Sequence, residues 1–134
     1  MTTFAELPAA FFLGQDRQRG PLVSELVAPT YRAEIAGFPP MDAAAHGDFG
    51  RAFYSAFPDL FHTIDEVVVA APCVTARFTM RGTQTGPFME IPPTGRAVEV
   101  TAICLLTVED GRVTKLRAIF DQLGMLRQLG VLPS

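Results

Sequence analysis

The dipeptide Asp110-Gly111 lies between two long apolar segments, residues 98–108 and 113–120. This pattern is the strongest short-range signal for a β-hairpin, because both central residues of a type I′ turn need positive φ angles. It predicts two paired antiparallel strands in the C-terminal half of the chain. Both faces of this pair are too apolar to be left in water. We therefore expect one face to lie under helices and the other to meet a second subunit.

The remaining elements are predicted from periodicity and from the prolines and glycines between periodic segments. Helix start and stop signals predict helices over residues 8–13, 21–27, 48–57 and 122–129. Polar and apolar residues alternate in strands expected over 61–69 and 75–81, while 35–45 and 85–95 are expected to form loops. At 134 residues the chain has the length of one domain. We expect residues 1–134 to form a single α+β domain, with helices on one side of a curved antiparallel sheet.

The composition excludes several classes of protein. Hydrophobic residues make up 49% and charged residues 19%, which is typical of a folded globular chain. A net charge of −3 argues against a nucleic-acid partner, which needs a basic surface. No apolar run approaches the ~20 residues that cross a membrane, and Glu6 without a basic leader argues against a secretory signal. Two cysteines, Cys73 and Cys104, are too few for a disulfide framework, so we expect free thiols in a cytoplasmic protein.

The hairpin register places two charged residues among aliphatic ones. If the turn has two residues, Arg117 lies opposite Cys104 and Asp121 opposite Val100. Both charges then share a face with residues such as Val98, roughly 13 Å apart at ~3.3 Å per residue. Unpaired buried charge is costly, so it needs partners, water or a ligand. We expect a pocket, open at one end, with the Asp121 carboxylate near its rim and the Arg117 guanidinium deeper inside.

Each of these charges also has a purely structural interpretation. Asp121 precedes Gln122-Leu123-Gly124, where a carboxylate would cap the last helix. Capping lowers the pKa of a carboxyl group, which suits a base and weakens a role as proton donor at neutral pH. Arg117 could be a rim residue whose stem packs while its guanidinium reaches water.

Two tyrosines and one glutamate are further candidates for the wall of a pocket. Tyr31 is expected after the second helix, where the chain enters the sheet, and Glu34 follows three residues later. Tyr54 lies beside Phe49 and Phe53, whose helical spacing predicts a core stripe. Its ring is expected to pack there with its hydroxyl facing inward.

The histidines and the second cysteine give weaker signals. His62 could be an imidazole base in the substrate site, or a core or edge histidine with its hydrogen bonds satisfied. His46, near the start of the third helix, is expected to be solvated, and Cys104 is expected to act as a small hydrophobic residue facing Arg117. Nothing favours a metal bound by the two histidines, and the sequence contains no HExxH, CxxC, GxGxxG or GxxxxGK[ST] motif.

Five segments, in order and with little need for gaps from about Arg51 to Pro133, resemble the SnoaL-like polyketide cyclase family of the nuclear transport factor 2-like superfamily. They are Ala56–Leu60, Arg81–Gly86, Ile91–Arg96, Val108–Val113 and Phe120–Gly130. The resemblance implies a cone-shaped roll, in which a curved antiparallel sheet and about three to four helices surround an apolar pocket. It also implies a homodimer or homotetramer, and chemistry without a metal or cofactor. In characterised cyclases of this family, the aspartate matching Asp121 is the acid/base of an intramolecular aldol closure.

The chain departs from the family pattern at three positions. Gln84 stands where relatives often carry histidine, in Gly82-Thr83-Gln84-Thr85-Gly86. Glu34 is the candidate for a histidine that many relatives carry shortly after the tyrosine matching Tyr31. Arg117 replaces a tryptophan common on the last strand.

We therefore expect a cofactor-independent enzyme acting on a polycyclic, polyketide-like or terpenoid-like small molecule. Its reaction is predicted to be an intramolecular aldol-type cyclisation or a related isomerase or lyase step. Asp121 would remove a proton next to a carbonyl, while Arg117 or Gln84 stabilises the oxyanion. Two alternatives remain open: epoxide opening that uses Asp121, Glu34 and Arg117, and a non-catalytic dimer module that binds a small ligand.

Overall fold

The computed structural model describes residues 2–133 and consists of one five-stranded sheet with helices packed against it. The elements are α1 (Leu7–Gln18), the short 3-10 helix η1 (Ser24–Leu26), β1 (Val27–Ile35), α2 (Ala43–Ala56), β2 (Phe61–Ala70), β3 (Cys73–Thr83), β4 (Ala97–Glu109), β5 (Arg112–Phe120) and α3 (Gln122–Gln128). The strands follow the order β1-β5-β4-β3-β2 in an open sheet. This arrangement confirms the predicted α+β class.

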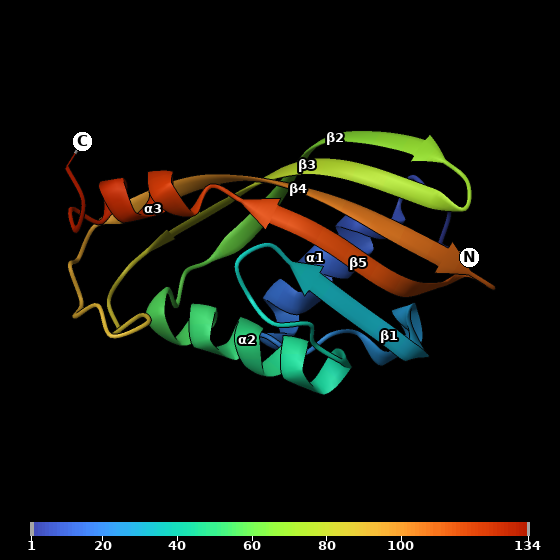
Figure 1. The fold of residues 1–134 in the computed structure, drawn as a ribbon, viewed down its shortest axis with the longest axis horizontal. Coiled ribbons are helices and arrows are strands. Elements are labelled where there is room, and N and C mark those ends of the chain that lie inside the picture. The colour runs from blue at the N-terminus through green and yellow to red at the C-terminus, as the bar shows by residue number, and fades with distance from the viewer. Residues whose placement is uncertain (1, 134) are drawn as a thin grey trace.

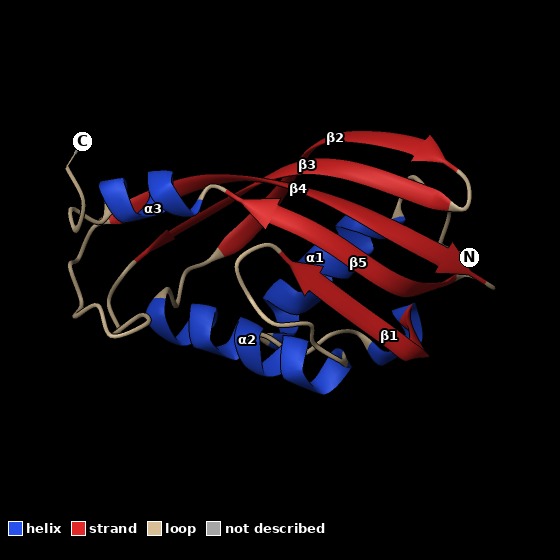
Figure 2. Cartoon of the chain, in the orientation of Figure 1, coloured by secondary structure: helices blue, strands red, loops and turns tan. Residues whose placement is uncertain are grey.

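Two helices cover one face of the sheet, as Figure 1 shows. Helix α1 packs against β2 and β3, and α2 packs against β1, whereas α3 contacts β4 at one end of the sheet. Along β4, buried residues alternate with more exposed ones, which is the pattern of a strand with one face on the core. The inward face of β4 carries Val98, Val100, Ala102, Cys104 and Leu106. Figure 2 shows the same arrangement with the strands in red and the helices in blue.

The prediction of a helix over residues 21–27 is wrong, since only the single turn η1 forms there and β1 follows it. Tyr31, Ala33 and Ile35 are buried at every second position, which is strand periodicity. Strand β1 runs parallel to β5, so the sheet is mixed and not wholly antiparallel. Pro29 does not end a helix; it lies in an irregular part of this edge strand, where no paired N–H is required.

Two helices are longer than their sequence signals suggest. Helix α1 continues through Gly14 to Gln18, where Gly14 gives it close access to the Val23 side chain. Helix α2 begins at Ala43 and not at residue 48, because the Asp42 carboxylate accepts a hydrogen bond from the backbone N–H of Ala45 at 2.8 Å. None of the helices among residues 2–133 is both long and apolar enough to cross a membrane.

The β4–β5 hairpin has the predicted turn but not the predicted register. Asp110 and Gly111 have φ angles of 51° and 76°, and Glu109 pairs with Arg112. A β-bulge then shifts the pairing, because Thr114 is an extra residue without a partner on β4.

Beyond the bulge the two strands are displaced by one residue from the expected pairing. Arg117 lies opposite Leu105, and Cys104 lies opposite Ala118. The predictions that Arg117 faces Cys104 and shares the inward face are therefore wrong. A shift of one residue turns every following side chain to the other face of the sheet.

Gln84 is completely buried and organises the loop between β3 and β4. Its amide nitrogen donates to the backbone carbonyls of Gly86, Ile91 and Pro92, at 3.1 to 3.3 Å. Its amide oxygen accepts from the backbone N–H and the hydroxyl of Thr94, at 3.2 and 2.8 Å. Both the donor and the acceptor of the Gln84 amide are therefore occupied by groups of the loop.

Replacing Gln84 by leucine should therefore destabilise the protein. The substitution leaves several loop groups without partners, and we expect the free energy of unfolding to fall by about 3 kcal/mol in urea denaturation followed by circular dichroism. Gln18→Leu is the matched control, because the Gln18 amide is exposed and donates only to the Pro21 carbonyl. An equal, small effect of both substitutions would contradict the role assigned to Gln84.

Candidate functional site

A cavity of about 70 Å³, open to solvent on one side, lies between the two covering helices and the sheet. Most of its wall is aromatic or aliphatic, including Phe12, Phe49, Phe53, Phe78 and Phe120. Its polar lining consists of Gln15, His46, Tyr54 and His62. An apolar cavity that takes up benzene measures about 150 Å³. A fused-ring ligand would therefore displace side chains or extend into the open mouth.

Three elements meet at the carboxylate of Asp16 on α1. Its Oδ1 lies 2.7 Å from Nδ1 of His62 on β2, and its Oδ2 accepts the backbone N–H of His62 at 2.8 Å. The hydroxyl of Tyr54 on α2 also donates to Oδ1. The side chains of Asp16 and His62 are only 15% and 8% exposed, so water weakens these contacts little.

Asp16 is a carboxylate and not a carboxylic acid at neutral pH. Burial acts to raise its pKa, but the hydrogen bonds and charge of His62, together with the Tyr54 hydroxyl, outweigh burial and hold the pKa below its usual value. A carboxylate only accepts hydrogen bonds, so Nδ1 of His62 carries the donated proton. In neutral His62 the lone pair therefore lies on Nε2. Phe12 stacks on this imidazole with ring centroids 5.1 Å apart and fixes its plane.

A second imidazole, His46 on α2, lines the same cavity. It is 5% exposed, so the prediction that it is solvated is wrong. Its Nδ1 lies 2.9 Å from the hydroxyl of Tyr31 on β1, and the two rings are stacked. Burial, with a smaller contribution from the charge of His62, lowers the pKa of His46 to about 4. Burial likewise raises the pKa of the Tyr31 hydroxyl, so the pair is neutral at pH 7.

The structure brings only some of the predicted substrate-binding residues to the cavity. Tyr54 and His62 line it, and Tyr31 is buried behind His46. Gln84 lies in its loop, and Cys104 is buried in β4 without being part of the cavity wall. Burial raises the pKa of the Cys104 thiol to about 12, which suits a hydrophobic residue.

The three predicted catalytic residues lie outside the cavity. Glu34 and Arg117 are neighbours on β1 and β5, their side chains are 46% and 58% exposed, and they approach to 3.4 Å. Lys115 also pairs with Glu34, and this contact lowers the pKa of the Glu34 carboxyl. Asp121 is exposed, and its Oδ1 accepts the backbone N–H of Gly124 at 2.8 Å, which makes it the cap of α3. The catalytic role of these residues stays a prediction.

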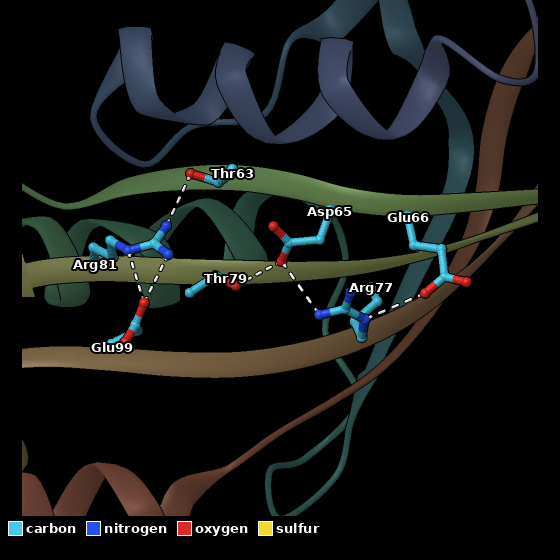
Figure 3. Close-up of polar contacts among 7 residues, drawn as sticks. All are labelled: Thr63, Asp65, Glu66, Arg77, Thr79, Arg81 and Glu99. Carbon is cyan, nitrogen blue, oxygen red and sulfur yellow. Dashed lines mark hydrogen bonds and ion pairs between the residues drawn. The ribbon is translucent and has the colours of Figure 1, made fainter.

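Charged groups on the outer face of β2, β3 and β4 form short networks with each other, as Figure 3 shows. Arg81 binds Glu99 at 2.7 Å and also donates to the hydroxyl of Thr63. Asp65 accepts from the hydroxyl of Thr79 at 2.6 Å and lies 3.6 Å from Arg77. These groups satisfy one another across strands, so they need no ligand.

The sequence interpretation missed Asp16, Gln15 and His46. Asp16 follows Phe12 by one helical turn, so a helix continued past Gly14 would have placed it on the buried side. His46 shares a face of α2 with Phe49, Phe53 and Gly50, at helical spacing. Within residues 2–133, no three histidine, cysteine, aspartate or glutamate side chains gather closely enough to hold a metal ion.

Comparison with known proteins accounts for this architecture. The model of the SnoaL-like polyketide cyclase family matches residues 7–129. The chain belongs to this family. Among curated proteins no match is found.

Solved structures of related proteins share the fold along most of the chain. IdmH from Streptomyces antibioticus, proposed to be a polyketide cyclase, is 29% identical with a TM-score of 0.82, over 92% of this chain and 96% of that one. TsrD from Streptomyces laurentii is 31% identical with a TM-score of 0.75, over 92% and 89%. AclR from Streptomyces galilaeus, proposed to be a hydroxylase, has a TM-score of 0.86 over 98% and 89%, but at 23% identity this likeness concerns the fold alone. The family and the likeness to IdmH support an activity of the general cyclase or isomerase kind.

The cap formed by Asp121 should contribute measurably to stability. Asp121→Ala leaves the first amides of α3 without their side-chain acceptor, so we expect the free energy of unfolding to fall by about 1 kcal/mol. Asp48→Ala is the control, since the exposed Asp48 carboxylate forms an ion pair with Arg51 one turn along α2 and caps no helix. Equal stability of the two variants in urea would mean that the cap is not stabilising.

The buried neutral His46 should make the protein less stable in mild acid. Its pKa of about 4 in the folded state lies below the ordinary 6.5, so between these values the unfolded chain binds more protons. This contribution to stability is complete above the ordinary pKa and is lost as the pH falls. From about pH 7 to about pH 4.5, we expect a loss of about 2 kcal/mol from this group.

Urea denaturation of the wild type and of His46→Gln at both pH values tests this expectation. The variant lacks the titrating group, so its loss of stability on acidification should be smaller by that amount. The same pH dependence in both proteins would contradict a neutral, buried His46.

Proposed function

We propose that the protein is a cofactor-independent acid/base enzyme that removes a proton next to the carbonyl group of a polyketide-like small molecule, as an aldol-type cyclase or related isomerase. The proposed general base is His62. The observation that carries this proposal is the 2.7 Å contact between the Asp16 carboxylate and Nδ1 of His62, a residue that lines an apolar cavity. Membership of the SnoaL-like family and the likeness to IdmH support the reaction class.

The proposed base is held in the orientation and tautomer that proton abstraction requires. Asp16 keeps the proton of His62 on Nδ1, so the Nε2 lone pair is available for the proton of a substrate carbon. The imidazolium that forms is stabilised by the adjacent carboxylate, which the Tyr54 hydroxyl holds in place. The proton then returns to another carbon in an isomerisation, or to the alkoxide in an aldol closure.

Asp121 remains the competing candidate for the base. It is the residue that the family resemblance favours, whereas the cavity geometry favours His62. Epoxide opening through two carboxylates and an arginine has less support. The wall of this cavity contains neither a carboxylate nor a guanidinium, and the more open hollow that Glu34 and Arg117 line does not include Asp121.

The expected homodimer or homotetramer is a further proposal. On the outer face of the sheet, Ile103 and Ile119 are 48% and 58% exposed and pair directly across β4 and β5. Such apolar side chains on a sheet face support assembly through that face.

Exchange of the α-protons of 2-tetralone for deuterium, followed by proton NMR, tests the proposed base. The wild type should accelerate exchange over buffer, because the reaction needs only proton abstraction next to a carbonyl. His62→Gln and Asp16→Asn should each slow the enzymatic exchange by about 100-fold or more. Asp59→Asn is the control, since Asp59 is an exposed carboxylate that accepts the backbone N–H of Thr83 outside the cavity.

Two results would overturn the proposal. The first is exchange no faster than in buffer with the wild type, and the second is undiminished exchange in His62→Gln. Loss of exchange in Asp121→Asn, with His62→Gln fully active, would instead assign the base to Asp121.

A further inference from the structure

The two imidazoles of the cavity are each held at Nδ1, but by partners of opposite character. His62 faces a carboxylate, which can only accept a hydrogen bond. His46 faces the hydroxyl of Tyr31, which can donate or accept. The hydrogen bond between Tyr31 and His46 can be donated by either residue. The direction of this bond decides whether Nε2 of neutral His46 is an N–H donor or a lone-pair acceptor.

The surroundings of Tyr31 settle this point. Its side chain is 2% exposed, and His46 Nδ1 is the sole hydrogen-bond partner of its hydroxyl among residues 2–133. If Nδ1 donated to Tyr31, the buried O–H would be left without an acceptor, at a cost comparable to a lost hydrogen bond. The Tyr31 hydroxyl therefore donates to Nδ1, and neutral His46 carries its proton on Nε2.

Nε2 of His46 is free to act on a ligand. Within residues 2–133, no protein group forms a hydrogen bond with this atom. Every fully buried side-chain nitrogen or oxygen in these residues does have a hydrogen-bond partner, so Nε2 of His46 is not fully buried. Nε2 therefore keeps accessible surface, and His46 lines the cavity together with His62. Both imidazoles line the cavity, and Nε2 is a lone-pair atom in neutral His62 and an N–H donor in His46.

We propose that His46 donates its Nε2–H to the carbonyl oxygen of the substrate, and that the site selects a neutral carbonyl group over a carboxylate or phosphate at this position. This inference rests on the proposed function, since it supplies the partner of the base. The rest of the wall is apolar apart from Gln15 and Tyr54 and contains no lysine or arginine to compensate a carboxylate or phosphate. Burying such a permanent anion without a cation is costly.

The two histidines then divide one proton transfer between them. Nε2 of His62 takes the proton from the carbon next to the carbonyl, and the electrons of that C–H bond form a carbon–carbon double bond. The electrons of the carbonyl double bond move to oxygen, which receives the hydrogen bond from Nε2 of His46. A neutral imidazole is suited to this task, because it stabilises charge that develops in the reaction without binding a preformed anion.

Binding of 4-nitrophenol tests the donor without using activity. A phenol has the planar C–O geometry of an enol, and absorbance titration reports its affinity at a pH where it is neutral. His46→Leu removes the donor, and we expect the affinity to fall by about tenfold. His46→Gln keeps an N–H donor, so its affinity for the phenol should fall by less. Asp59→Asn should bind the phenol like the wild type. 4-Nitrobenzoate, a permanent anion of similar size, should bind about tenfold more weakly than the phenol.

Tyr31 is a positioning residue, and its role has a spectroscopic signature. Long-range ¹H–¹⁵N correlation spectra of the wild type should show His46 with a protonated Nε2 and an unprotonated Nδ1. Tyr31→Phe removes the donor to Nδ1, so the spectrum should shift toward a mixture of both tautomers. A purely structural role of Tyr31 would leave the tautomer unchanged.

The outcomes separate this inference from the proposed function. A protonated Nδ1 in wild-type His46, undiminished phenol affinity in His46→Leu, or absence of phenol binding to the wild type would each overturn it. The exchange of 2-tetralone and its loss in His62→Gln would still stand in those cases. Loss of the His62-dependent exchange would overturn the proposed function, even with His46 binding the phenol as expected.

Discussion

The carboxylate of Asp16 is the contact on which the interior of this protein depends. It receives hydrogen bonds from the backbone and ring of His62 on β2 and from Tyr54 on α2, and it is itself part of α1. A partly buried charge is tolerated only when its partners are in place, so this group fixes the position of both covering helices relative to the sheet. The same contact sets the tautomer of His62. Structure and chemistry therefore share one ionised group, and a change that frees the carboxylate alters both.

The environment of each histidine determines its chemistry more than its residue type does. His62 is held by an ionised acceptor, whereas His46 is held by a neutral hydroxyl in a nearly dry part of the core. Burial keeps the pKa of His46 at about 4, so it is uncharged under ordinary conditions. Two identical side chains can thus take opposite roles in one cavity, which is how folds run acid and base chemistry together.

The parts of the fold that could be predicted from the sequence are those set by local signals. The Asp110-Gly111 turn, the long strands β2 to β5, and the α+β class follow from turn chemistry and period-two patterns. Strand β1 carries the same period-two signal at Tyr31, Ala33 and Ile35, but no local signal predicts its parallel pairing with β5, which joins segments far apart in the chain.

The candidate site could be predicted only in part, for a related reason. The sequence predicts that Tyr54 faces inward and offers His62 as a possible base, but Asp16 meets them only through packing of α1 on β2. The placement of Arg117 and Asp121 required knowledge of the bulge at Thr114, and no turn or periodicity signal marks that extra residue. Local patterns gave the elements, whereas the contacts between distant elements decided which side chains share the cavity.

The bulge at Thr114 also has a consequence for how such interiors diversify. Because strand side chains alternate, even pairing that kept Thr114 within the ladder would turn the rest of β5 over. Leu116 and Ala118 would then give up their inward positions to Arg117 and Ile119. Deletion of Thr114 would instead leave Leu116 opposite Leu106, as it is now. In this scaffold, substitutions near the turn that suppress the bulge could therefore exchange an oily lining for a cationic one, and they are a route to new ligand preferences.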